Sequence, residues 1–170
     1  TLILTDIFLY KTIKKEEKVS SQPETIINDT KSNLIEGIEY FSKDVNGNTY
    51  IIQSVSGSLD KENPDIIYLI DVEAKINFDE NDVIKVTSNK AIYNVSNFDT
   101  EFIDNVKLSY EDNKVTCKNI IVKFSKNYAI LSGDLVYNNL LTKLYADRME
   151  VDLVSRITKT SMINQKDKIK

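Results

Sequence analysis

The sequence VTSNKAIYNV, residues 86–95, decides the fold. Its apolar or small positions are Val86, Ser88, Ala91, Tyr93 and Val95. Alternation with a period of two is typical of a strand with one buried face, and here it is interrupted once, between Ser88 and Ala91. One extra residue reverses the side-chain phase, and a β-bulge or corner keeps both halves directed at the core. We therefore expect a strand that bends between these two residues.

The same pattern is repeated along the chain. Copies start at Val115 and Leu144, each 29 residues after the one before, and a fainter copy starts at Ile52. The matching positions are Val115, Cys117, Ile120, Val122 and Phe124; Leu144, Ala146, Met149, Val151 and Leu153; and Ile52, Ser54, Gly57 and Leu59. The segments between copies also repeat, with Phe102, Asp104, Val106 and Leu108 corresponding to Leu131, Gly133, Leu135 and Tyr137. Repeats of about 30 residues indicate stacked supersecondary units, here two bent strands each.

Clusters of Asp and Asn separate the stretches that are rich in Ile, Val, Tyr and Phe. They occupy residues 43–48, 60–65, 79–82, 94–99, 111–113 and 137–139. Such residues form turns between β-prone segments, and past the N-terminus no segment has the sustained apolar spacing of a helix. We predict an all-β fold, a twisted, V-shaped β-jelly roll of stacked antiparallel hairpins. A closed up-and-down barrel and an ordinary sandwich are the competing architectures, and a bulge repeated at one position favours a continuous crease.

The N-terminal residues differ from the rest of the chain. Residues 1–10, TLILTDIFLY, are mostly apolar but too few to span a bilayer, which takes about 20 residues. We interpret residues 1–18 as the end of an N-terminal membrane anchor, helical or membrane-proximal, and residues 19–33 as a linker; a short amphipathic helix is the alternative. The β-jelly-roll domain is expected over residues 34–157. A frayed tail is expected over residues 158–170, where the apolar positions of the repeat are lost.

The composition excludes several classes of function. The formal net charge is −4, which argues against a nucleic-acid partner. The chain has no His, the commonest general base and metal ligand. Cys117 is the only cysteine, so no intrachain disulfide can form, and its simplest interpretation is a small core residue. Since no catalytic or phosphate-binding motif is present either, we predict no catalytic residues, no metal site, no cofactor and no enzymatic activity.

The inward positions predict either a closed core or an apolar groove. The groove candidates are Val86, Ala91, Tyr93, Val106, Leu108, Val115, Ile120, Val122, Phe124, Leu131, Leu135, Tyr137, Met149 and Val151. A V that leaves these side chains uncovered has a large apolar patch, and such patches usually bind something. About ten buried methylenes of an acyl chain, at about 0.8 kcal/mol each, would outweigh a surface lysine contact worth about 0–1 kcal/mol. The lysines at outward strand positions are Lys85, Lys90, Lys107, Lys114, Lys118 and Lys123.

Residues 83–124, VIKVTSNKAIYNVSNFDTEFIDNVKLSYEDNKVTCKNIIVKF, resemble the core of the LptC, LptA and OstA-like family of lipopolysaccharide export proteins. The family's patterns of apolar and small residues correspond to Val86-Ser88-Ala91-Tyr93, Phe102-Asp104-Val106-Leu108 and Val115-Cys117-Ile120-Val122. Residues 37–57 resemble the family's first hairpin, and the resemblance covers residues 34–157. Asp104 stands where the family has Gly, whereas Gly133 keeps the glycine in the next unit.

The resemblance implies a non-enzymatic carrier in the periplasm, anchored in the bacterial inner membrane by its N-terminal segment. The implied partners are lipopolysaccharide, bound through its lipid A acyl chains, the LptB–LptF–LptG transporter and the bridge protein LptA. Exposed edge strands would pair with partner edges by β-augmentation. The partner-edge candidates are Ile38, Tyr40 and Phe41, implied to meet LptF, and Leu144, Ala146, Val151 and Leu153, implied to meet LptA.

Three alternatives stay open. The first is a soluble bridge protein of the LptA type, although the membrane-like start of the chain favours the LptC branch. The second is a structural or interaction module of β-repeats with a closed core, which a dry interior would favour. The third is an enzyme such as a glycan hydrolase, which would need two inward-facing carboxylates where the pattern places few.

Overall fold

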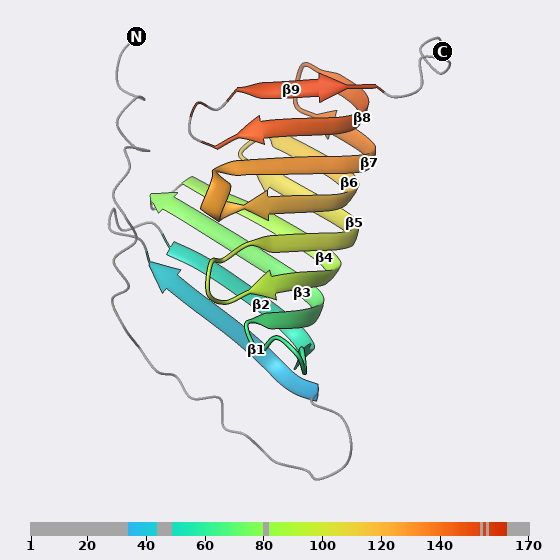
Figure 1. Ribbon diagram of the computed structural model, residues 1–170. Helices are drawn as coiled ribbons and strands as arrows, with labels where there is room; N and C mark the ends of the chain where they lie inside the picture. Colours follow the sequence, from blue (N-terminus) through green and yellow to red (C-terminus); the bar gives the residue numbers. More distant parts are fainter. Residues whose placement is uncertain (1–33, 44–48, 80–81, 154, 156, 163–170) are drawn as a thin grey trace.

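The computed structural model describes residues 34–43, 49–79, 82–153, 155 and 157–162. These residues form nine antiparallel strands in a single sheet, and the strand order follows the sequence from β1 to β9 (Figure 1). The strands are β1 (Leu34–Lys43), β2 (Thr49–Leu59), β3 (Ile66–Asp79), β4 (Asp82–Asn94), β5 (Thr100–Tyr110), β6 (Asn113–Lys123), β7 (Tyr128–Asn138), β8 (Lys143–Asp152) and β9 (Thr158–Ser161). A single 3-10 turn, η1 (Phe124–Lys126), follows β6. The predicted all-β class is confirmed.

The sheet is an open meander with β1 at one edge and β9 at the other. Because spatial neighbours are also sequence neighbours, the described strands contain no Greek-key crossover, and the jelly-roll part of the expectation is not shown. The closed barrel considered from the sequence is excluded for the same part of the chain, because β1 and β9 do not pair.

The strands from β4 to β8 shift register by one residue at matching positions. The shifts lie between Thr87 and Lys90 of β4, Ile103 and Val106 of β5, Thr116 and Asn119 of β6, and Ser132 and Leu135 of β7. Those in β6 and β7 lie 29 residues after those in β4 and β5. The bend predicted between Ser88 and Ala91 therefore coincides with a register shift, and the shift recurs with the period of the sequence repeat. The extra residue of each shift lies on the partner strand, β5 or β7, where four residue steps oppose three on β4 or β6.

The shifts form a corner at which the sheet folds over, and Figure 1 shows the strands curving there. We call the half of the sheet that carries Ala91, Phe102, Ile120 and Leu131 the first arm. We call the half that carries Val86, Leu108, Val115 and Tyr137 the second arm. Buried side chains of both arms belong to one hydrophobic cluster, so the core lies between them.

Left-handed backbone at the corner is confined to the odd-numbered strands. The described corner residues with positive φ are Gly37 of β1, Asp71 of β3, Asp104 and Asn105 of β5, and Gly133 and Asp134 of β7. Asp and Asn are the non-glycine residues that adopt this conformation most readily, because their short polar side chains bond locally. The aspartate that replaces glycine at position 104, with φ of 62°, therefore fills the same backbone role as Gly133, with φ of 80°.

The N-terminal strands pass the corner differently. Between β1 and β2, Glu36 pairs with Ser56 and Ile38 with Ser54, so the register is the same on both sides of Gly37. The same holds between β2 and β3 on either side of Asp71. The N-terminal strands therefore bend together without a change of register.

The C-terminal end of the sheet differs from the expectation. Residues 158–170 were predicted to be frayed, whereas Thr158–Ser161 form β9 and pair with Arg148–Val151 of β8. The threonines suit a strand, and the otherwise free edge of β8 supplies their hydrogen bonds. The predicted anchor and linker, residues 1–33, lie outside the described residues, as do residues 163–170. Within the described residues, no helix has the length and apolar character needed to cross a bilayer.

Candidate functional site: the inner face of the folded sheet

The inner face consists of rows of side chains that cross the sheet from strand to strand. On the first arm, successive partners are Leu69, Ala91, Phe102, Ile120, Leu131 and Met149. On the second arm they are Ala74, Val86, Leu108, Val115, Tyr137 and Leu144. The corner keeps both rows on one face, because the register shift restores the phase that the extra residue reverses.

The structure places the groove candidates on this face in two groups. The buried candidates are Val86, Ala91, Tyr93, Val106, Val115, Ile120, Leu131 and Leu135. The half-buried candidates are Leu108, Val122, Phe124, Tyr137, Met149 and Val151. Val106, at the corner of β5, is 0% exposed, so the first group packs between the arms as a core. Only the second group has side-chain surface that a ligand can reach without displacing an arm.

Sequence reasoning missed several residues of this core, among them Ile67, Leu69 and Val72. Ile67 and Leu69 belong to the continuous apolar run IIYLI, residues 66–70, in which periodicity gives no face. The partners of β3 could have resolved it, because Leu69 pairs with Ala91, an inward residue of the repeat.

In two copies of the repeat, those of β4 and β6, the small residue satisfies a carbonyl group at the bulge. The Ser88 hydroxyl donates to the Lys90 carbonyl oxygen at 2.7 Å, and the Cys117 thiol donates to the Asn119 carbonyl oxygen at 3.4 Å. Both bonds span two residues and occur 29 residues apart, where the ladder is interrupted. Ser54 of β2, where no slip occurs, has a buried hydroxyl oxygen without a partner among the described residues. Ser88 and Cys117 therefore perform the same hydrogen-bonding function at the two bulges, although Ser54 and Ala146 at the matching positions of the other copies do not.

Cys117 has the environment of a structural residue. It is buried, and burial raises the pKa of its thiol from the ordinary value of 9.0 to about 11. A thiol activated for nucleophilic attack has a lowered pKa instead, because only the thiolate reacts. The structure therefore agrees with interpreting this cysteine as a core residue.

Two aromatic contacts connect the arms at the N-terminal end of the sheet. Tyr40 of the second arm lies 5.3 Å from Tyr93 of the first, measured between ring centroids. Tyr50 of the second arm meets Phe124, which follows β6 on the first arm, edge to face at 5.6 Å. Desolvation by burial, and to a lesser extent the charge of Tyr40, raises the pKa of Tyr93 to about 12. These pairs close the inner face over β1 to β6.

The burial of the inner-face side chains decreases towards β8 and β9. Leu144, the last member of the second-arm row, is 38% exposed, whereas Leu69 of β3 is 1% exposed. Met149 and Val151 of β8 are half-buried, and their partners on β9 are the exposed Thr160 and Thr158. The apolar inner face is therefore accessible at its C-terminal end.

The partner-edge candidates lie on β1 and at β8, two strands whose edges differ in how much of them is left unpaired. Ile38, Tyr40 and Phe41 belong to β1, the N-terminal edge, and Phe41 is exposed while Ile38 is buried. Leu144 and Ala146 lie in the part of β8 that β9 leaves uncovered, whereas Val151 pairs with β9. Leu153 lies just beyond β8, half-buried.

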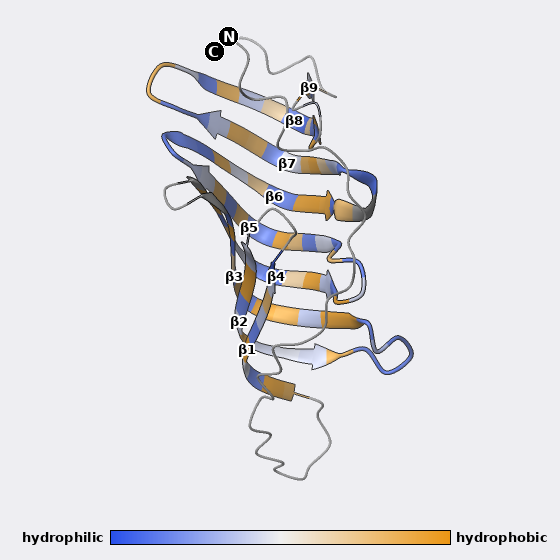
Figure 2. Cartoon of the chain, turned by 90° about the vertical axis from the view of Figure 1, so that its left-hand side faces the viewer, coloured by the Kyte–Doolittle hydropathy of each residue, from blue (hydrophilic) through white to orange (hydrophobic). Residues whose placement is uncertain are grey.

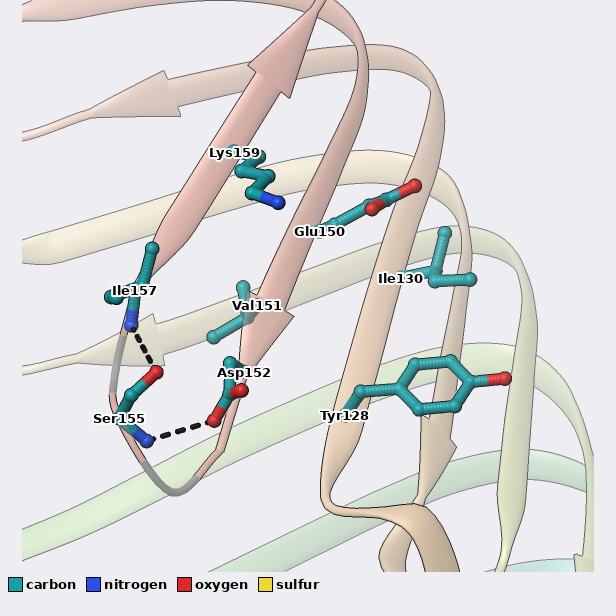
Figure 3. A pocket seen from close by; sticks show the side chains of 8 residues that line it. All are labelled: Tyr128, Ile130, Glu150, Val151, Asp152, Ser155, Ile157 and Lys159. Atoms are coloured by element: carbon teal, nitrogen blue, oxygen red, sulfur yellow. Dashed lines mark hydrogen bonds between the residues drawn. The ribbon is translucent and has the colours of Figure 1, made fainter.

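A depression of about 460 Å³ lies at the end of the first arm, over β7, β8 and β9 (Figure 3). It is lined by Tyr128, Ile130, Glu150, Val151, Asp152, Ser155, Ile157 and Lys159. Ile130, Glu150 and Lys159 are successive partners on the outer face, alternate to the inward Leu131 and Val151. The Asp152 carboxylate accepts the Ser155 N–H at 2.8 Å, which orders the β8–β9 turn beside it. The row of Ile130, Glu150 and Lys159 places the depression mainly on the outer face, although the inward Val151 also lines it. No feature of the sequence pointed to this depression.

The polar chemistry of the described interior is limited. Its buried polar side chains are Ser54, Ser88 and Thr100, and no carboxylate is among them. The same part of the chain contains no cluster of His, Cys, Asp and Glu suited to a metal ion. The inner face can therefore shelter apolar groups, and its hydroxyl groups serve the backbone.

A comparison of the chain with known protein families and with curated proteins found no match.

Proposed function

We propose that the folded sheet is a non-enzymatic carrier that shelters the acyl chains of lipopolysaccharide between its arms, in the manner of the LptC, LptA and OstA-like family. The observation that carries the proposal is the continuous apolar inner face, whose cover decreases from β3 to β8. An acyl chain contributes about 0.8 kcal/mol for each CH₂ removed from water, without needing a charged partner. This suits a chain of net charge −4, whose overall field does not attract an anionic lipid.

In this proposal the lipid meets the inner face at its C-terminal end. Leu144, Met149 and Val151 have surface there that an acyl chain can contact directly. Movement towards β4 would require the arms to separate, and each aromatic contact that would then break is worth about 0.5–1.5 kcal/mol. Such contacts can hold the carrier closed when empty and still yield to a lipid.

The finer features of the resemblance belong to the same proposal. They are a V-shaped jelly roll, a periplasmic location, an inner-membrane anchor in residues 1–18, delivery from LptB–LptF–LptG and transfer to LptA. The free edge of β1 and the uncovered part of β8 are the strands available for β-augmentation. The soluble bridge type remains the variant without an anchor.

The second candidate is an interaction module with a closed core. Val106, Ile120 and Leu135 favour it, because they are almost completely buried at the middle of the sheet. In that case the two edges would bind partners, and the interior would serve stability alone.

Photo-crosslinking in Gram-negative cells tests the carrier. A photoreactive amino acid at Tyr137 or Met149, both half-buried on the inner face, should form adducts with lipopolysaccharide. Val136 and Arg148 are matched controls, because they lie on the outer face of the same strands, next in sequence to Tyr137 and Met149. Adducts confined to the inward positions support the carrier. Folded protein with no adduct at either inward position, or equal adducts at the controls, contradicts it and favours the closed module.

A further inference from the structure

The β7–β8 hairpin ends in two leucines that project into solvent. Leu140 is 81% exposed and Leu141 is 94% exposed. Figure 2 shows the loop that carries them as an orange, hydrophobic loop at the upper left, beyond the ends of the strands. A pair of adjacent leucines with this exposure is unusual in a turn, where polar residues are the rule.

The turn around the leucines is well ordered. The Asn139 side-chain oxygen accepts the N–H groups of Leu141 at 3.0 Å and Thr142 at 2.8 Å. The Asn139 side-chain amide donates to the Tyr137 hydroxyl at 2.7 Å, and that hydroxyl donates to Asn113 of the next hairpin at 2.6 Å. Because the backbone is held in this way, the leucines are presented with little further loss of conformational freedom when they bind.

The residues behind the tip have the chemistry of a membrane interface. Tyr145 is exposed, and the Lys143 ammonium lies 5.1 Å from the centre of its ring. Lys114 and Lys143 flank Asn138 in one outward row across β6, β7 and β8, and neither has an ion pair within the described residues. Tyrosines and lysines are typical of the headgroup region of a bilayer, and leucines are typical of the acyl region beneath it.

We propose that the β7–β8 hairpin is a membrane-docking tip, in which Leu140 and Leu141 insert into the acyl region of a bilayer while Tyr145, Lys143 and Lys114 meet the headgroups. The neighbouring β5–β6 turn carries Glu111 and Asp112, so the leucines supply most of the affinity and the lysines add a preference for anionic lipids. This function is independent of lipid carriage between the arms, because the tip lies on the turn and outer face of the second arm.

Tryptophan fluorescence of the full chain tests the tip. The sequence has no Trp, so Leu141→Trp introduces a single reporter at the proposed insertion point. With phosphatidylcholine vesicles that contain phosphatidylglycerol and brominated acyl chains, its emission should shift to the blue and be quenched. Val55→Trp is the matched control, because Val55 is 64% exposed but lies at the corner of β2. Equal quenching at both positions, or none at position 141, overturns the proposal, whatever residues 1–33 contribute to vesicle binding.

Substitutions then separate the two contributions. In the Leu141→Trp background, Leu140→Ser should weaken the quenching-monitored affinity by about tenfold or more. Lys143→Gln and Lys114→Gln should each weaken it by about fivefold, and only when the vesicles contain phosphatidylglycerol. These side chains are exposed, so circular dichroism should stay unchanged. A change in oligomeric state without vesicles after Leu140→Ser would instead show that the tip contacts a second copy, and would overturn the proposal.

Discussion

The N-terminal and C-terminal ends of the folded sheet have the same repeat but different cover. At the β1–β4 end, Tyr40 and Tyr93 meet across the arms, and the rows behind them are buried. At the β7–β9 end, the same rows finish in Leu144 and in the threonines of β9, which are exposed. The difference teaches that an alternating pattern defines which side chains share a face of the sheet. How deeply that face is buried depends on the residues of the opposite arm.

Truncation of one leucine at each end of the sheet should have the largest effect, and equal effects would contradict the difference between the ends. Leu69→Ala removes a 1% exposed side chain at the closed end and should lower the free energy of unfolding by about 2–5 kcal/mol. Leu144→Ala at the open end should lower it by less than about 1 kcal/mol, because solvent already reaches the site. Urea unfolding of both variants measures the difference. Equal losses would contradict the unequal cover.

A glycine at the closed end tests how tightly β2 and β3 pack there. A Cβ atom on Gly57 would lie 2.6 Å from the Tyr68 carbonyl oxygen and 2.7 Å from Ile38 Cδ1. Gly57→Ala should therefore lower the free energy of unfolding by about 1–3 kcal/mol. The outward Ser56→Ala should change it by no more than about 0.5 kcal/mol. Chemical denaturation compares them, and a neutral Gly57→Ala would show that this end is looser than described.

Alkaline pH should distinguish the two bulges that carry Ser88 and Cys117. Between pH 9 and 11 the folded protein keeps the Cys117 proton that the unfolded chain loses, because burial raises the thiol pKa to about 11. Its contribution to stability is thus complete below pH 9 and falls by about 2 kcal/mol as the pH rises through this range.

The Cys117→Ser variant is the control for this pH effect, because it makes the β6 bulge chemically like that of β4. Its stability should fall less steeply than that of the parent chain between pH 9 and 11. Thermal unfolding at several pH values measures both slopes. Parallel slopes would mean that the thiol titrates normally in the folded state.

The aromatic contact between the arms should have the smallest effect. A double-mutant cycle with Tyr40→Leu and Tyr93→Leu should give a coupling energy of about 0.5–1.5 kcal/mol. A photo-crosslinker at Met149 in the double variant would sharpen the comparison, since loosening the closed end should not reduce capture at the open one. A coupling near zero would show that the rings do not hold the arms together.

The bend of each strand could be predicted because a two-residue period leaves a clear mark when it slips, as between Ser88 and Ala91. Asp104 and Gly133 also stand 29 residues apart in the repeat, and both have left-handed backbone at the corner, which the structure and not the sequence revealed. Sequence alone could not give the exposure of Leu144 or Met149, because the exposure of an inner-face side chain depends on the separation of the arms. It also missed β9, since a short strand of threonines depends on the edge that β8 offers.

The residues of the candidate site were predicted to share one face of the sheet, and the structure divides them into a buried group and a half-buried group. Val106 and Tyr137 are both inward by pattern, yet Val106 is buried and Tyr137 is half-buried. The sequence carries the alternation that both share, but burial depends on how the sheet twists over itself. The exposed Leu140 and Leu141 could have been found earlier, as apolar residues inside an Asn-rich turn, where neither core nor helix needs them.

The sequential strand order makes the molecule extensible. The extensive backbone contacts among the described strands join only successive strands, so the hydrogen-bonded ladder of a two-strand unit depends on its immediate neighbours. A 29-residue unit starts and finishes in the same phase, and it lengthens the sheet by about two strand spacings, or about 9–10 Å. Duplication or loss of one unit would therefore change the length of the inner face in steps of two strand spacings, while leaving both edges and the hairpin tip intact.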